Sequence, residues 1–326
     1  MEKNVAKTQN SEFSNMIDAL LPDRIFDAHM HISHVGFSSS AMSSDGILDL
    51  ASYRSAMSGL IGGRELFCNA ITYPVQSLEN PEELSRSVSF LASQMELDPT
   101  AVGEVMVMPW DSIEDIEKRL VHPQIRGLKC YWIYSKSGAG DQSDIGDFLP
   151  RAAWEVANAR GLYITLHMVK DRALADTENL SYIKTMARQY PNVTLILAHC
   201  ARAFAAWTVF DTVDELVGLP GVMFDFSGIA ESPAMSYIIK RVGIKRCMWG
   251  SDSPISEFIG KPISIADTFH WIVGTELALL KGGNLPAGSV GAEGLLAFRQ
   301  TVKILDLSAS DVEDFFYHNA KNLFYR

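Results

Sequence analysis

The sequence predicts a single (β/α)8 barrel, and three observations lead to this α/β fold class. Eight short, near-continuous apolar runs recur along the 326-residue chain, as expected of parallel strands that are buried on both faces. Segments of helical periodicity lie between these runs, which indicates βαβ units and a parallel sheet. Finally, the chain is long enough for a closed barrel, whose typical size is about 250 residues.

Each predicted strand coincides with one apolar run, and the runs cover residues 24–32, 66–74, 104–110, 126–134, 162–169, 193–200, 221–228 and 246–252. The predicted helices between them cover residues 81–96, 112–120, 148–161, 181–192 and 203–221. Asn80 precedes the first helix as a good N-cap, and Gly161 ends the third, as glycine commonly does. The second helix carries acids early and bases late, which suits the helix dipole.

The chain is expected to form one domain that spans residues 1–326. A polar arm, residues 1–22, precedes the barrel, and a helical tail, residues 257–326, is expected to pack on it. The tail could also build a homodimer interface. The competing architecture, an open doubly wound sheet, predicts a glycine-rich turn after the first strand. The sequence AHMHISHVG stands there instead, so a dinucleotide-binding fold is disfavoured.

Composition and charge exclude several classes of function. The formal net charge is −11, whereas nucleic-acid binding requires a basic surface. This charge does not exclude an anionic small-molecule substrate, because a metal ion or local arginines can set the field of a cleft. The four cysteines form no Cys-x-x-Cys pair and lie in or beside apolar runs, as free thiols in a reducing cytoplasm do. Without a secretory signal or a run of about 20 apolar residues, the protein is expected to be cytoplasmic and not to span a membrane.

Three histidines lie within six residues at the end of the first predicted strand, in the stretch FDAHMHISH. Side chains two apart on a strand point the same way, so His29 and His31 should both face the barrel interior at its C-terminal mouth. Two imidazoles aimed at one point are costly to bury unless they share a partner such as a divalent cation. His34 follows the strand and is expected to line the mouth or face solvent. A His-x-His pair by itself remains a weak signal.

The ends of three later strands carry matching residues. His167 ends the fifth predicted strand, His199 the sixth, and Asp252 follows the eighth. Together with the first strand, four strands place histidine or aspartate at the same end of the barrel. Neutral imidazoles and a carboxylate suit zinc and several other divalent ions. The combined pattern therefore predicts a metal site at the mouth.

This order of residues resembles the amidohydrolase superfamily, and in particular the amidohydrolase-related branch that includes aminocarboxymuconate semialdehyde decarboxylase. The segments that carry the resemblance are FDAHMHI, GLK, ARGLYITLH, PNVTLILAH, DFSG, WGSDSP and HNAKNLFYR. The resemblance implies one divalent ion, Zn²⁺ in the first place with Mn²⁺ or another divalent ion as alternatives. It implies that His29, His31, His167 and Asp252 hold this ion. Asp252 would also accept a proton, and His199 would polarise the substrate or exchange protons as a general acid and base.

Other candidate residues keep two or more interpretations. Lys129, in RGLKCYW, could bridge two metals as a carboxylated lysine, contact substrate, or serve the structure alone. Arg202 could grip a substrate carboxylate or form a surface salt bridge. Tyr73 and Trp132, at or just beyond strand ends, could line an aromatic pocket or belong to the core or rim.

The predicted function is that of a metal-dependent hydrolase that acts on a C–N or C–O bond of a small carbonyl compound, such as an amide or lactone. The alternative is a non-oxidative, metal-dependent decarboxylase of a small unsaturated or aromatic acid, which would use the same five residues. A barrel that retains the metal site without catalysis is a third hypothesis. The substrate is in each case a small molecule, with a carboxylate as one option.

Overall fold

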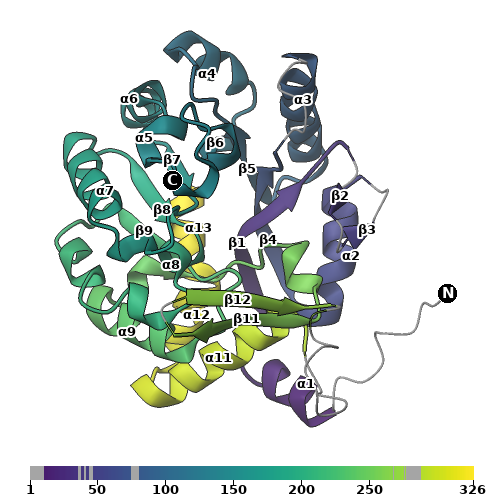
Figure 1. Ribbon diagram of the computed structural model, residues 1–326. Coiled ribbons are helices and arrows are strands. Elements are labelled where there is room, and N and C mark those ends of the chain that lie inside the picture. The colour runs from purple at the N-terminus through teal and green to yellow at the C-terminus, as the bar shows by residue number, and fades with distance from the viewer. Residues whose placement is uncertain are drawn as a thin grey trace.

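The computed structural model describes residues 11–35, 38–39, 42–43, 47–74, 81–266, 268–274, 276 and 288–326. Its centre is one sheet of eight parallel strands in the order β1-β4-β5-β6-β7-β8-β9-β10, surrounded by helices (Figure 1). The strands are β1 (Arg24–Ile32), β4 (Glu65–Thr72), β5 (Ala101–Met106), β6 (Ile125–Cys130), β7 (Tyr163–Leu166), β8 (Thr194–Leu197), β9 (Val222–Asp225) and β10 (Cys247–Met248). Each of the eight predicted strands is present, and the predicted (β/α)8 barrel is confirmed.

The barrel closes along a seam between the chain after β10 and strand β1. The backbone N–H of Asp252 donates to the carbonyl of His29 at 2.7 Å, and that of His31 donates to the carbonyl of Ser253 at 2.9 Å. A parallel bridge between Met30 and Ser253 continues this pairing. The first and last strands of the barrel therefore meet at the position where the sequence carries its histidine pair and its aspartate.

The outer layer consists of helices that largely follow the sequence prediction. They are α2 (Leu50–Ile61), α3 (Pro81–Leu97), α4 (Ile113–Arg119), α5 (Ile145–Phe148), α6 (Arg151–Arg160), α7 (Thr177–Gln189) and α9 (Ser232–Val242), with α1 (Ser11–Asp18) before the barrel. A capping box between Ser112 and Asp115 starts α4. Gly161, with a φ of 64°, ends α6 as expected, because glycine adopts this left-handed conformation without strain. The expected N-cap at Asn80 lies outside the described residues.

The helix predicted over residues 203–221 is wrong. The segment contains two short 3-10 turns instead, Ala206–Thr208 and Val213–Leu216. Asp211 between them has a φ of 66°, which an α-helix does not tolerate. The run of tryptophan, threonine, valine and phenylalanine at 207–210 also has low helix propensity.

The tail from residue 257 is only partly helical, which corrects the prediction. Strands β11 (Gly260–Ile265) and β12 (Thr268–Val273) form an antiparallel hairpin, so His270 lies in a strand and not in a tail helix. The period-two pattern of β-branched and aromatic residues in these segments accounts for the hairpin. Helices α11 (Val290–Leu305), α12 (Ala309–Glu313) and α13 (Asn319–Phe324) follow. The one other hairpin in the described part of the chain pairs β2 (Ser38–Ser39) with β3 (Met42–Ser43).

Helix α13 packs at the end of the barrel opposite the mouth, where the strands begin. The Phe324 ring stacks on Phe26 of β1 with centroids 5.2 Å apart and meets Tyr163 of β7 edge-on at 4.7 Å. All three side chains are buried. In Figure 1 this yellow helix overlaps the ring of strands in projection, and its ring contacts show that tail residues close the floor of the barrel.

Candidate metal centre

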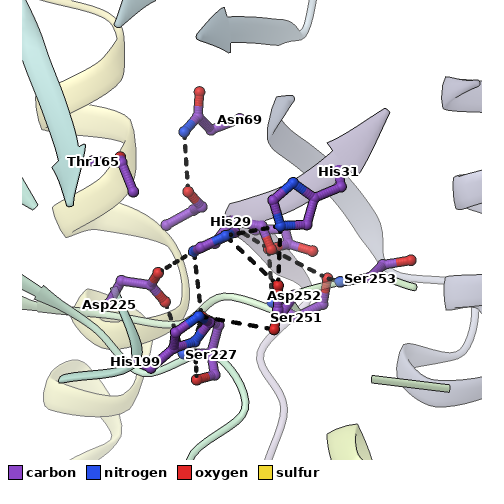
Figure 2. A network of polar contacts seen from close by, with 12 residues as sticks. His29, His31, Asn69, Thr165, His199, Asp225, Ser227, Ser251, Asp252 and Ser253 are labelled. Carbon is purple, nitrogen blue, oxygen red and sulfur yellow. Dashed lines mark hydrogen bonds and ion pairs between the residues drawn. The ribbon is translucent and has the colours of Figure 1, made fainter. Parts of the chain in front are cut away.

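His29 and His31, from the C-terminal end of β1, and Asp252, after β10, converge at the mouth of the barrel (Figure 2). The Nε2 atoms of the two imidazoles lie 3.2 Å apart. Asp252 Oδ1 lies 3.2 Å from Nε2 of His31 and 3.6 Å from Nε2 of His29. One donor atom from each of the three residues falls within 4.8 Å of the others, and all three side chains are buried. This cluster could hold a metal ion.

The orientation of His29 is fixed by Asp225, at the end of β9. Nδ1 of His29 lies 2.5 Å from Oδ2 of this buried carboxylate, and the backbone N–H of Ser227 donates to Oδ1 at 2.7 Å. Burial would raise the pKa of Asp225, but His29 outweighs this effect and keeps the carboxyl ionised. A carboxylate that accepts the Nδ1 proton leaves the Nε2 lone pair directed toward the cluster. Asp225 therefore orients His29 by binding the ring nitrogen that faces away from the cluster.

The protonation states of the cluster suit a cation. Burial lowers the pKa of His29 and of His31, so both imidazoles are neutral near pH 7. Burial alone would raise the pKa of Asp252, but His199 and the hydrogen bond with His31 hold it well below its usual range. Two neutral imidazole nitrogens and a carboxylate oxygen are an established donor set for zinc and other divalent ions. The residues present thus fit the metal that the sequence predicts.

His199 lies beside this cluster in a strained turn. Its Nδ1 lies 2.9 Å from the carbonyl of Ser227, and its Nε2 lies 3.9 Å from Asp252 Oδ2. Four consecutive residues that are not glycine, from His199 to Arg202, have φ between 50° and 63°, and Asp252 has a φ of 57°. A left-handed helical conformation costs an L-residue roughly 1–2 kcal/mol. Such strain concentrates at functional sites, where the surroundings must hold it in place.

His167, which the resemblance implies as a further metal ligand, lies next to His199. Its Nδ1 lies 2.8 Å from the carbonyl of Met168, and its ring faces His199 edge-on with centroids 5.1 Å apart. Among the described residues it does not belong to the group of donors that lie within 4.8 Å of one another. The structure thus brings His167 next to His199, and its role as a metal ligand stays a prediction.

Lys129 of β6 is a buried basic residue near the mouth. Its side chain is 1% exposed, and no hydrogen bond or ion pair within 4.0 Å joins its ammonium group to another described residue. Its Nζ lies 5.2 Å from the centroid of the Tyr131 ring. Burial lowers the pKa of Lys129, although the charges of Glu104 and Asp252 oppose this effect. Lys129 is thus a buried basic group near the cluster, and its contact with substrate stays a prediction.

Sequence reasoning missed a polar layer in the barrel interior. Glu104 Oε1 accepts from Asn69 Nδ2 at 2.5 Å and from Thr165 Oγ1 at 2.7 Å. Burial raises the pKa of Glu104 to about 7. A Cβ at Gly127 would lie 2.0 Å from Tyr163 and 2.7 Å from Glu104, so glycine is required beside this layer. A glutamate and an asparagine inside predicted buried strands were the signals that could have revealed it.

The remaining candidates differ in how close they lie to the cluster. Tyr73 meets His31 edge-on with ring centroids 5.3 Å apart, whereas Trp132 is half-buried in a 3-10 turn (Trp132–Tyr134) after β6. The side chain of Arg202 is only 15% exposed. Its Nη1 donates to the carbonyl of Lys170 at 3.2 Å, and its Nη2 lies 3.7 Å from Asp141. Arg202 is therefore not a simple surface residue.

A closed barrel whose charged and strained residues gather at the C-terminal ends of its strands has the architecture of a barrel enzyme. The chain belongs to the amidohydrolase family: the family model described as Amidohydrolase matches residues 86–326. This confirms the predicted resemblance. Among the described residues, no helix combines the length and the apolar character that a bilayer span requires.

Comparison with individual proteins gives more distant likenesses. An L-fucono-1,5-lactonase of Burkholderia ambifaria is 25% identical over 206 residues, which cover 58% of this chain and 66% of the lactonase, just under two thirds of its length. A zinc-bound amidohydrolase of Burkholderia multivorans superposes with a TM-score of 0.60 at 14% identity over 92% of this chain and 99% of that one.

A second structural relative is a decarboxylase. The 5-carboxyvanillate decarboxylase of Novosphingobium aromaticivorans, in complex with manganese and 4-hydroxy-3-methoxy-5-nitrobenzoic acid, also has a TM-score of 0.60, at 13% identity over 93% of this chain and 96% of that one. At these identities the structural likeness shows the fold alone.

Proposed function

We propose that the protein is a metal-dependent hydrolase that opens a small carbonyl compound, with a lactone as the preferred substrate class. The observation that carries this proposal is the convergence of His29, His31 and Asp252 beside His199, a protonatable group held in a strained turn. The relationship to a curated lactonase supports hydrolysis of a C–O bond in preference to a C–N bond.

One divalent ion, preferably zinc, would be held by His29, His31 and Asp252, with His167 as the further ligand that the family resemblance implies. A bound ion would supply a water of lowered pKa and a Lewis acid for a carbonyl oxygen. Relatives of the same fold bind zinc or manganese. The single three-donor cluster in the described part of the chain supports one ion in preference to two bridged by Lys129.

The residues of the chain would divide the proton transfers between them. Asp252 Oδ2 lies 3.9 Å from Nε2 of His199, so a proton taken up by the carboxylate can pass between these two groups or to the leaving oxygen. The Ser227 carbonyl accepts the Nδ1 proton of His199, which makes Nε2 the atom that gains or loses a proton. When protonated, Nε2 would donate a hydrogen bond to the substrate carbonyl oxygen as negative charge develops there.

The charge distribution supports a substrate that carries a carboxylate. Lys129 is buried without a hydrogen-bond or ion-pair partner among the described residues, and the largely buried Arg202 has N–H groups beyond those used by Lys170 and Asp141. An anionic substrate group could pair with either of these two basic side chains. Tyr73, whose ring meets His31 edge-on, would border the same space.

The second candidate function is non-oxidative decarboxylation of a small aromatic or unsaturated acid. Lys129 favours it, because its ammonium group, which has no hydrogen-bond or ion-pair partner among the described residues, could hold the carboxylate that is lost. In this reaction protonated His199 would deliver a proton to carbon. The same five residues serve either chemistry.

A substrate panel separates the two functions. Sugar-acid lactones, other lactones, amides and small aromatic acids are incubated with the metal-loaded protein, and acid release is followed in a pH-stat while evolved carbon dioxide is trapped. We expect acid release from a lactone, and its loss in Asp252→Asn. Release of carbon dioxide alone would overturn the hydrolase proposal in favour of the decarboxylase.

A further inference from the structure

The imidazole of His199 stacks with two other rings. The His29 ring lies with its centroid 5.2 Å away at an interplanar angle of 28°. Phe204 also stacks on His199, with centroids 5.6 Å apart and an angle of 29°. Because Ser227 already binds Nδ1, the plane of this ring and the direction of Nε2 are both set by neighbours.

Phe204 is in turn held by the hairpin of β11 and β12. Its ring centroid lies 4.9 Å from that of Phe269 and 5.1 Å from that of Trp271, at angles of 49° and 66°. Phe269 and Trp271 are two apart on β12, so they project from the same face of the hairpin. A continuous series of rings therefore runs from the candidate metal cluster through His199 and Phe204 to the hairpin.

The hairpin is anchored at this place by polar contacts as well. Ser264 Oγ donates to the carbonyl of Phe204 at 3.2 Å and lies 2.8 Å from Glu231 Oε1. Lys261 Nζ lies 3.6 Å from Glu293 Oε2 of α11. An isolated two-stranded hairpin is at best marginally stable, so its contacts with the barrel must hold it. Figure 1 shows the hairpin next to α8 (His199–Arg202) and α11.

The turn that these rings cover needs such support. The left-handed residues His199 to Arg202 would relax toward ordinary φ values unless packing opposes it. Phe204 is 4% exposed and lies two residues after this turn, so its burial against Phe269 and Trp271 resists relaxation of the turn. The Arg202 guanidinium also lies over the ring of Phe269, at 5.2 Å from its centroid.

We infer that Phe204, Phe269 and Trp271 form an aromatic clamp, a set of positioning residues that fixes the imidazole of His199 beside Asp252. The inference rests on the proposed function, because it assumes that His199 exchanges protons with the substrate. It assigns a task to the hairpin, which the barrel itself does not require. The clamp residues do not contact the reacting atoms, and they act through His199.

The kinetic test compares two substitutions at one position. Phe204→Leu removes the ring and should lower kcat by about tenfold or more at a nearly unchanged KM, since small misplacements of a catalytic group are costly. Phe204→Tyr keeps the stacked ring and should restore kcat to within about threefold of wild type, which is under ~0.7 kcal/mol of barrier. Trp271→Leu tests the same clamp from the hairpin. His270→Ala, on the outer face of β12, is the matched control and should leave kcat unchanged. A fall in kcat that Phe204→Tyr shares with Phe204→Leu would contradict the role of the ring.

A second measurement does not depend on activity. Histidines are modified with diethyl pyrocarbonate, and the rate at His199 is followed by mass spectrometry of its peptide. We expect slow modification in the wild type and in His270→Ala, and a rate about tenfold higher in Phe204→Leu and Trp271→Leu, because a freed imidazole is more accessible. Unchanged rates in both clamp variants would overturn the inference. If His199→Gln retained full activity, the proposed function would fail, while the modification rates would still decide whether the clamp exists.

Discussion

The two ends of the barrel are filled by opposite kinds of side chain, and strand β1 contributes to both. At its N-terminal end, Phe26 packs among Phe67, Tyr325 and Phe324 with ring centroids between 5.2 and 6.1 Å. A few residues later, His29 and His31 each direct one nitrogen toward a carboxylate oxygen of Asp252, so that three donor atoms meet. Burial of the aromatic rings at the floor stabilises the folded state. At the mouth, buried polar groups and strained backbone cost stability. Stability and function are therefore expected to separate along a single strand.

The largest expected effect is at the mouth. His31→Ala should abolish stoichiometric metal binding and lower kcat/KM by at least about 10³-fold, which corresponds to ~4 kcal/mol of barrier. The denaturant midpoint of the metal-free protein should change little, because a polar group is removed. Metal content by mass spectrometry, steady-state kinetics and urea unfolding measure the three quantities. A variant with full metal content would show that His31 is not a ligand.

The floor should respond in the opposite way. Phe324→Ala removes a fully buried ring and should lower the free energy of unfolding by about 3–5 kcal/mol. The folded fraction should bind metal as the wild type does. Ile304→Ala, at a 61% exposed position, is the control and should change stability by no more than about 0.5 kcal/mol. Loss of metal binding in the folded Phe324→Ala variant would contradict the expectation that the floor determines stability and the mouth determines metal binding.

The polar layer between the two ends gives a prediction about pH. Burial raises the pKa of Glu104 from 4.5 to about 7, so between these values the folded state binds more protons than the unfolded state. Stability linked to this group is therefore full below about pH 4.5 and falls as the pH rises toward 7, by up to ~3 kcal/mol. Glu104→Gln removes this dependence. The stability of this variant relative to wild type should therefore increase on going from pH 5 to pH 8. Urea unfolding at both values measures the difference, and a constant difference would contradict the raised pKa.

The smallest expected effect concerns the support behind His29. Asp225→Asn replaces the carboxylate that accepts the Nδ1 proton and should weaken metal affinity by about 10–100-fold. Competition with a chelator of known affinity measures this change. Asp214→Asn, which breaks an exposed ion pair with Arg241, serves as the control. An equal loss of affinity in both variants would mean that the effect is not specific to the site.

Local pattern was sufficient to predict much of this protein. The apolar runs gave the eight strands, and the alternation of side chains on β1 placed His29 and His31 together. Asp252 was found because the C-terminal ends of parallel strands meet at one edge. The partners Asp225 and Ser227 were harder to assign, since each acts on a histidine that is far away in the sequence.

The errors have a common physical origin in tertiary context. Residues 203–221 have a partly amphipathic pattern, yet the left-handed turn before them and Asp211 within them interrupt any helix. The hairpin of β11 and β12 is stabilised by Phe204, which belongs to another part of the chain. Glu104 was missed because a carboxyl in an apolar run has no local signature of its partners. The sequence pattern predicts helices and strands, whereas the turn, the hairpin and the environment of Glu104 depend on contacts between segments that are far apart in the sequence.

The convergence of ligands at the mouth is tested most directly by anomalous diffraction from zinc-soaked crystals, recorded on both sides of the zinc absorption edge. We predict one strong peak within coordination distance, about 2.0–2.2 Å, of Nε2 of His29, Nε2 of His31 and a carboxylate oxygen of Asp252. The same map would show whether His167 completes the shell. Absence of a peak at this position, in crystals that bind zinc elsewhere, would contradict the account.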